Sequence, residues 1–97
     1  MSAAAEQIIF LRFLLQATTK QQNCLLKLIT TQQLDAVGEV CYNILYGEVD
    51  VAPLKQHQRI IRVLGDKKVS ARRRRALVVK HPRTVILAVR QALKDDS

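Results

Sequence analysis

The chain is poor in the residues on which secreted domains, phosphate loops and metal sites depend. Its 97 residues include two cysteines, two histidines, three glycines and no tryptophan. Two cysteines are too few for the disulfide framework of a small secreted domain, which favours a reducing intracellular compartment. Three scattered glycines leave no glycine-rich loop that could cradle a phosphate.

The histidines and cysteines also lack the spacing that catalysis or metal binding needs. His57 and His81 have no Cys or carboxylate at metal-ligand spacing, and a zinc site takes about four ligands. Cys24 and Cys41 fall among apolar residues of expected helices, which is typical of buried, unreactive thiols. His57 falls on an apolar stripe, where a histidine is more often hydrogen-bonded at the edge of a core than used as a base. We therefore expect no enzyme, no metal site and no cofactor.

Long apolar runs and aromatic residues are scarce as well. The longest apolar block, residues 8–15, is interrupted by Arg12 and is much shorter than the roughly 20 residues that cross a bilayer, so no membrane span is expected. The aromatic residues all lie in the first half of the chain: Phe10, Phe13, Tyr42 and Tyr46. Because the basic residues gather in the second half, no aromatic platform for stacking bases is expected beside them.

Positive charge is concentrated in the second half of the chain. Residues 1–50 carry three basic and five acidic groups, a net charge of −2, whereas residues 51–97 carry thirteen basic and three acidic groups, a net charge of +10. The stretch from Lys67 to Arg83 contains no acid. Its unbroken run from Arg72 to Arg75 repels itself, which is tolerated most readily where a polyanion is the partner.

Apolar periodicity predicts one all-α domain over residues 1–97, a compact bundle of about five to six short helices. The clearest helix begins after Thr30, whose spacing to Gln33 is that of a capping box, and ends near Gly47. Within its apolar stripe, Gly38 indicates close approach of a neighbouring backbone. Residues 1–47 would form an acidic and apolar scaffold half, and residues 53–97 a basic half.

The other helices are expected at residues 3–15, 24–29, 53–64, 71–79 and 82–93. Polar residues 18–23 are interpreted as a break, residues 48–52 as a connector and residues 94–97 as a frayed tail. The helices at 53–64 and 71–79 also permit a helix-turn-helix, with the second helix in the major groove. That helix lacks an Asn or Gln to pair with adenine, which argues against sequence-specific readout.

In two of the expected helices, side chains of one chemical type lie on more than one face. Four consecutive arginines sweep about 300° of the helix circumference, so at least one must reach back across the domain or toward a partner. The first helix is apolar on more than one face, which is typical of a helix central to a bundle or at an oligomer interface. Its candidate interface residues are Ile9, Phe10, Phe13 and Leu14.

Several short motifs between Leu34 and Leu77 match a known pattern: Gly38-Glu39, Tyr42-Asn43-Ile44-Leu45, Gly47, Pro53-Leu54, and residues 64–70 (LGDKKVS) followed by the basic run. With these motifs, nearly half of the chain resembles a small basic protein of adintoviruses and Polinton-type DNA transposons. The resemblance implies a viral or transposon-borne product encoded alongside capsid genes, such as a virion core or packaging component in the nucleus or virion. Members of that family often continue into a Gly-rich apolar tail. This chain has an amphipathic segment at Arg83 to Leu93 instead, which puts a membrane-active role in doubt.

The basic stretch has three interpretations: a solvated charged face, a nuclear import signal, or a nucleic-acid-binding surface. We favour binding through phosphates, with DNA preferred over RNA, because cations that neutralise phosphates release counterions and the start of a helix adds N–H donors. The expected contact residues are Lys67, Lys68, Arg72, Arg73, Arg74, Arg75, Lys80 and Arg83.

The alternative function is a helical adaptor for protein assembly. It would assemble through the first helix and the Gly38-bearing helix, and its arginines would dock an acidic protein partner. A homo-oligomer is compatible with either function, because it would multiply the basic patches.

Overall fold

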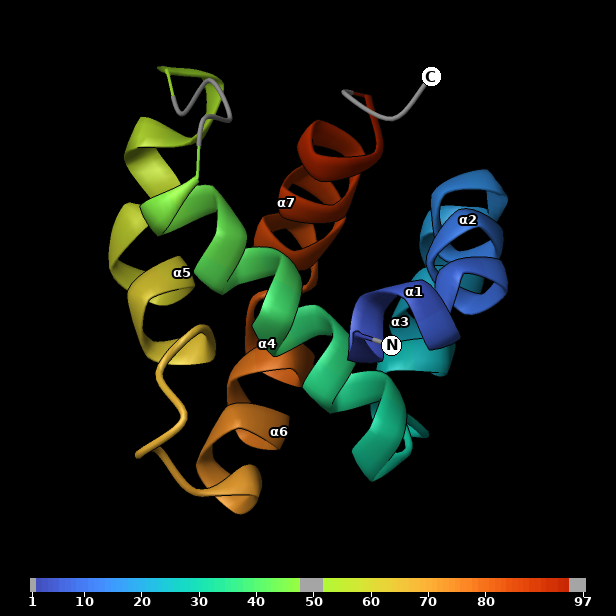
Figure 1. Ribbon diagram of the computed structural model, residues 1–97. Coiled ribbons are helices and arrows are strands. Elements are labelled where there is room, and N and C mark those ends of the chain that lie inside the picture. Colours follow the sequence, from blue (N-terminus) through green and yellow to red (C-terminus); the bar gives the residue numbers. More distant parts are fainter. Residues whose placement is uncertain (1, 48–51, 95–97) are drawn as a thin grey trace.

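The computed structural model describes residues 2–47 and 52–94, and these ranges contain seven α-helices and one 3₁₀ helix (Figure 1). In chain order the elements are α1 (Ala3–Glu6), α2 (Ile8–Gln16), α3 (Thr19–Lys27), α4 (Thr31–Tyr46), η1 (Ala52–His57), α5 (Gln58–Leu64), α6 (Ala71–Lys80) and α7 (Pro82–Lys94). The described ranges contain no strand, so the predicted all-α fold is confirmed. The expected connector at residues 48–52 and tail at 94–97 lie mostly outside them.

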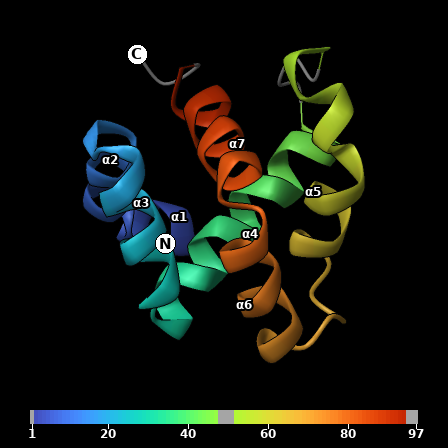
Figure 2. The same cartoon turned by 180° about the vertical axis from the view of Figure 1, so that it is seen from behind.

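Helix α4 is the element around which the others pack. It contacts α1, α5, α6 and α7, and the two opposite views show it crossing the middle of the molecule, with α7 on its far side (Figures 1 and 2). The predicted capping box is present: Thr30 Oγ1 accepts from the Gln33 backbone N–H at 3.1 Å, and Gln33 Oε1 accepts from the Thr30 N–H at 3.0 Å. The helix ends at Tyr46 and Gly47 is its C-cap, as predicted.

Close packing at Gly38 joins α4 to the end of α5. A Cβ atom at Gly38 would lie 3.0 Å from the Leu64 carbonyl oxygen, so the expected approach of a neighbouring backbone is confirmed. One core cluster draws on both halves of the chain, and its largest fully buried side chains include Leu11, Leu14, Leu26, Leu34, Leu54, Ile61, Leu64, Val78 and Val85. The two halves therefore share their apolar interior.

The N-terminal segment differs from the expected single helix over residues 3–15. It breaks at Gln7, which has non-helical backbone angles and separates α1 from α2. Helix α1 is attached to α4, because the Ala3 backbone N–H donates to Glu39 Oε2 at 2.8 Å. Helix α2 packs against α7. Because of the break, α1 can pack against α4 while α2 packs against α7.

Helix α3 begins and ends earlier in the chain than predicted. The polar residues 18–23, interpreted as a break, form its first turns, and a second capping box links Thr18 to Gln21. The apolar residues Leu28 and Ile29, expected inside the helix, lie beyond its end. Because α3 buries only Leu26, it has little apolar periodicity for sequence analysis to detect.

The segment expected as one helix over residues 53–64 is divided between η1 and α5. Helices α6 and α7 follow the predicted limits to within one residue, and Ser70 is the predicted N-cap of α6. None of the helices in the described ranges is both long and apolar enough to cross a membrane.

Candidate nucleic-acid interface

The structure divides the eight predicted contact residues between the surface and the body of the fold. Arg74 and Arg75 are only partly exposed, whereas the other six are exposed, and none of these six forms an ion pair with an acid in the described ranges. The six are Lys67, Lys68, Arg72, Arg73, Lys80 and Arg83. The candidate interface is therefore smaller than predicted.

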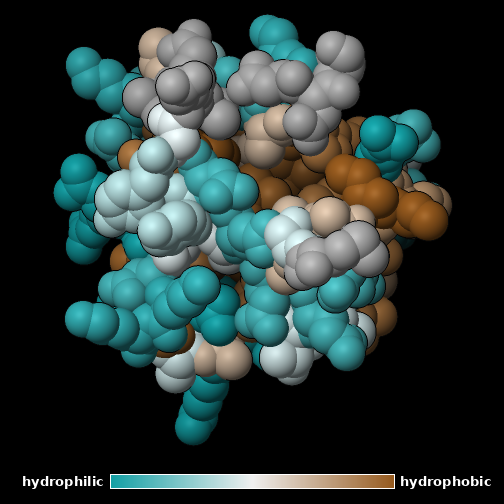
Figure 3. Space-filling view, viewed as in Figure 1, coloured by the Kyte–Doolittle hydropathy of each residue, from teal (hydrophilic) through white to brown (hydrophobic). Residues whose placement is uncertain are grey.

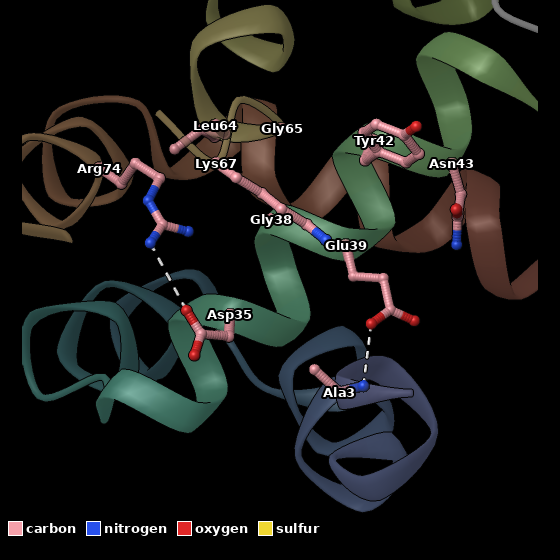
Figure 4. Close-up of a pocket in the computed structure, with 10 residues that line it drawn as sticks. All are labelled: Ala3, Asp35, Gly38, Glu39, Tyr42, Asn43, Leu64, Gly65, Lys67 and Arg74. Carbon is pink, nitrogen blue, oxygen red and sulfur yellow. Dashed lines mark hydrogen bonds and ion pairs between the residues drawn. The ribbon is translucent and has the colours of Figure 1, made fainter. Parts of the chain in front are cut away.

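Arg74 and Arg75 reach back across the domain. Arg74 Nη2 lies 3.5 Å from Asp35 Oδ1, and the Arg74 side chain is 13% exposed (Figure 4). Arg75 donates through Nη1 to the Ile29 carbonyl oxygen and through Nη2 to Thr31 Oγ1 at 3.4 Å. The expectation that at least one arginine turns inward is confirmed. These two contacts attach α6 to the start of α4, so both guanidinium groups are engaged within the fold.

Helical geometry explains why Arg72, Arg73 and Lys80 remain outside. At about 100° per residue, these three point to one side of α6, while Val78 points to the opposite side and is fully buried. Ser70 Oγ accepts from the Arg73 backbone N–H at 3.2 Å and fixes the first turn. The exposed face of α6 is thus a row of cations about 12 Å long from Arg72 to Lys80.

The turn before α6 adds two more cations. Lys67 and Lys68 are exposed there, and Asp66 Oδ1 accepts from the Lys68 backbone N–H at 2.9 Å. The turn lies directly against α4, because a Cβ atom at Gly65 would be 2.9 Å from the Tyr42 backbone nitrogen. Asp66 is the only acid within residues 52–94, so little negative charge offsets this region.

Arg83 lies apart from the turn, in the first turn of α7. Together with Arg90 it lines a hollow of about 390 Å³ whose other wall includes Thr19 and Asn23 of α3. Figure 2 shows the face on which α3 and α7 meet. The predicted residues therefore form one cationic row on α6 and its preceding turn, with Arg83 and Arg90 as a second cationic site.

A mixed-charge hollow of about 580 Å³ lies between α1, α4 and the start of the basic turn (Figure 4). Its acids are already engaged, since Asp35 faces Arg74 and Glu39 accepts from the Ala3 N–H. Within the described ranges, no three His, Cys, Asp or Glu side chains are grouped so that they could hold a metal ion.

The histidine and cysteine assignments are partly right. His57 Nδ1 lies 2.8 Å from the hydroxyl of buried Thr84, so it is a hydrogen-bonded histidine at the edge of the core, as expected. Cys41 is fully buried, and burial raises its pKa to about 12, which keeps it a neutral thiol. Cys24 is exposed, so the expectation that it is buried is wrong.

The four residues predicted at an oligomer interface fall into two groups, one in the interior and one on the surface. Leu14 is fully buried inside the chain and Phe10 packs against the core, so both belong to the interior rather than to a free surface. Ile9 and Phe13 are 82% and 56% exposed and, at i and i+4, share the outer face of α2. The alternative adaptor function also expected assembly through the Gly38-bearing helix. The face of α4 that carries Gly38 packs within the fold, so it is not available to a partner.

Two exposed tyrosines contradict the expectation that no aromatic ring lies near the basic residues. Tyr42 and Tyr46 of α4 line a hollow of about 470 Å³ together with Lys67 and Lys68. Sequence analysis had a signal for them, since both lie outside the apolar stripe of α4. It could not show that the turn after α5 folds back onto that face.

The helix-turn-helix interpretation is weakened by the connector between α5 and α6. Residues 65–70 separate the two helices, whereas the turn in that motif has roughly three or four residues. Comparison of this chain with protein-family models, curated proteins and solved structures found no match.

Proposed function

We propose that this helical domain binds nucleic acid, mainly through phosphate contacts that are largely independent of sequence. The observation that carries the proposal is the cationic row: Lys67, Lys68, Arg72, Arg73 and Lys80 are exposed along one turn and one helix face, and no acid in the described ranges pairs with them. Arg83 at the start of α7 is a sixth exposed cation. A rigid helix holds much of this charge in place.

Phosphate is the group that suits this surface best. Each phosphate neutralised by Lys or Arg releases condensed counterions, and a guanidinium can also bind a phosphate through two parallel hydrogen bonds. The exposed face of α6 presents Arg72, Arg73, Ala76, Val79 and Lys80, with no amide side chain to read adenine. Binding is therefore expected to tolerate many sequences.

The biological setting is part of the same proposal. The resemblance to the small basic protein of adintoviruses and Polinton-type transposons favours a core or packaging component acting in the nucleus or virion, with DNA preferred over RNA. A nuclear import signal in the same basic run is compatible with binding, because each function uses exposed Lys and Arg.

The test is the salt dependence of binding to labelled duplex and single-stranded oligonucleotides. If all six exposed cations contact phosphate, a plot of log K against log salt for duplex DNA has a slope of about −5. Arg72→Ala is expected to lower the magnitude of the slope by about one. Arg12→Ala, which removes an exposed cation from α2, is the control and is expected to leave the slope unchanged. Binding that is insensitive to salt, or no binding to either form, would contradict the proposal.

The exposed pair Ile9 and Phe13 favours a second function, self-association through the outer face of α2. Two large apolar side chains one helical turn apart suit a symmetric contact between copies. Light scattering at two concentrations tests it: the average mass should rise with concentration, and Ile9→Glu with Phe13→Glu should hold it at the monomer value. A constant monomer mass for the unmodified chain would remove this function and leave nucleic-acid binding untouched.

A further inference from the structure

We infer that α4 and the turn before α6 form a groove for single-stranded nucleic acid, in which unpaired bases stack on Tyr42 and Tyr46 while Arg62, Lys67 and Lys68 contact the phosphates. The inference rests on the proposed function and deepens it, because it names the form of nucleic acid that the site prefers. It follows from the hollow that these five side chains line together.

The two tyrosine rings are available for stacking. Tyr42 and Tyr46 are 45% and 73% exposed, although large aromatic side chains are usually covered in a folded domain. Their ring centroids are 4.8 Å apart and the rings are tilted by 48°, so they support each other without covering both faces. An aromatic face of this kind can stack on any base, because every base has a π-face.

The charge around the rings complements a phosphate backbone. Arg62, Lys67 and Lys68 are exposed at the hollow, and Asp66 is the one acid among its lining residues, which leaves a net charge of +2. The Asp66 carboxylate already accepts a hydrogen bond from the Lys68 backbone N–H. A groove that combines cations with exposed aromatic rings is the arrangement used by proteins that bind single strands.

Packing places the backbone of the basic turn beside the helix that carries the rings. At Gly65 the turn touches the α4 backbone so closely that a Cβ would lie 2.9 Å from the Tyr42 nitrogen and 3.1 Å from its Cα. Tyr42, Gly65 and Lys67 also border the mixed-charge hollow of Figure 4, where Lys67 extends along α4 toward Glu39. The backbone of the basic turn is therefore packed against the helix that carries the rings.

The view in Figure 3 shows how this face differs from its neighbour. Hydrophilic side chains cover the side of the molecule formed by α5 and α6, whereas hydrophobic ones gather between α7 and α2. The tyrosine hollow is lined from α4, α5 and the turn and so belongs to the hydrophilic side. Hydrophilic surroundings, together with the net positive charge of the lining residues, favour a polyanion over an apolar protein segment as the occupant.

Unpaired bases distinguish a single strand from a duplex at this site. In a duplex the base faces are covered by their neighbours, so an exposed tyrosine cannot stack on them without the cost of opening the helix. A single strand presents its bases freely while its phosphates reach the same cations. We therefore expect single strands to bind more tightly than a duplex of equal length.

Intrinsic fluorescence gives a direct readout of the groove. The chain has two tyrosines, Tyr42 and Tyr46, and no tryptophan, so its tyrosine emission comes from the proposed site. An oligothymidylate or oligouridylate of about twelve nucleotides is expected to quench this emission as it binds. A hairpin duplex should bind with little quenching, and the two oligonucleotides show whether DNA or RNA is preferred.

Substitutions test the role of the rings with a labelled oligonucleotide and anisotropy. Stacking of one base on an aromatic ring is equivalent to about 5- to 150-fold in affinity. Tyr42→Ala with Tyr46→Ala should weaken single-strand binding at least tenfold and change duplex binding less than twofold. Tyr42→Phe with Tyr46→Phe keeps the rings and should retain binding. Leu28→Ala, which removes an exposed apolar side chain just beyond the end of α3, is the control and should have no effect.

The outcomes separate this inference from the proposed function. Equal affinity for both forms, no quenching and no effect of the tyrosine substitutions, combined with a smaller salt slope in Arg72→Ala, would overturn the groove and keep phosphate binding. Absence of binding to every oligonucleotide would overturn both. Tighter single-strand binding that is quenched and depends on the rings supports both.

Discussion

Two pairs of arginines from the same run should affect binding and stability in opposite ways. Arg72→Ala with Arg73→Ala removes two exposed cations from the face of α6. Arg74→Met with Arg75→Met removes the same number of charges from the side that contacts Asp35, Ile29 and Thr31. The second pair is a matched control for long-range electrostatics, because the net charge of the two variants is the same.

The expected slopes follow from the number of exposed cations. Six contacts to duplex DNA correspond to about −5.4 in log K against log salt, and four contacts to about −3.6. A fourfold increase in salt should then weaken binding by about 2,000-fold in the unmodified chain and by about 150-fold in Arg72→Ala with Arg73→Ala. Arg74→Met with Arg75→Met should keep the slope near −5.4, because the exposed row remains intact.

The inward-facing pair should matter more for stability than the exposed pair. The Ile29 carbonyl oxygen accepts a hydrogen bond from the Arg75 guanidinium, so loss of that donor should lower the free energy of unfolding by about 1 to 3 kcal/mol. Arg72→Ala with Arg73→Ala should change it by less than about 0.5 kcal/mol, as is usual at exposed positions. Urea unfolding followed by circular dichroism measures this difference.

One result would contradict the assignment of Arg74 and Arg75 to the fold. If both pairs lower the magnitude of the slope equally, while both variants remain folded by circular dichroism, then Arg74 and Arg75 also contact phosphate. The division of the run between fold and surface would then be wrong, even though nucleic-acid binding itself would stand.

Three further predictions concern buried side chains and their exposed counterparts. Leu14→Ala should lower the free energy of unfolding by about 2 to 5 kcal/mol, because Leu14 is fully buried, whereas Phe13→Ala on the exposed face of α2 should cost much less; urea denaturation compares them. Cys24 should react at once with a thiol reagent and Cys41 only after unfolding. Since burial raises the pKa of Cys41 from 9.0 to about 12, its contribution to stability is complete below pH 9.0 and falls above it by about 1.4 kcal/mol per pH unit. Cys41→Ala should reduce that alkaline loss, and an equal loss in both proteins would contradict it.

Local signals predicted much of the fold. The all-α class, the capping box at Thr30, the N-cap at Ser70 and the limits of α7 depend on residues close together in the sequence. The same rule applied to Thr18 and Gln21 would have located α3, but the polar residues between them were interpreted as a break. The division at Gln7 has no comparable signal, because it depends on where α1 and α2 pack.

The candidate site was predicted less completely because its geometry is tertiary. Periodicity shows that four consecutive arginines cannot share one face, yet only the position of Asp35 and Ile29 decides which of them turn inward. Tyr42 and Lys67 are separated in the chain by the end of α4, by η1 and by the whole of α5, and the packing at Gly65 brings them together. Helical periodicity alone contains no information about that contact.

The inward-facing arginines have a consequence for the denatured chain. When the domain unfolds, Arg74 and Arg75 are released from Asp35 and Ile29, so the denatured chain presents the whole uninterrupted run to any polyphosphate. A ligand that also binds the unfolded state raises the melting temperature less than its affinity for the folded state implies. Heating the domain with oligonucleotides would then understate how tightly the folded form holds them.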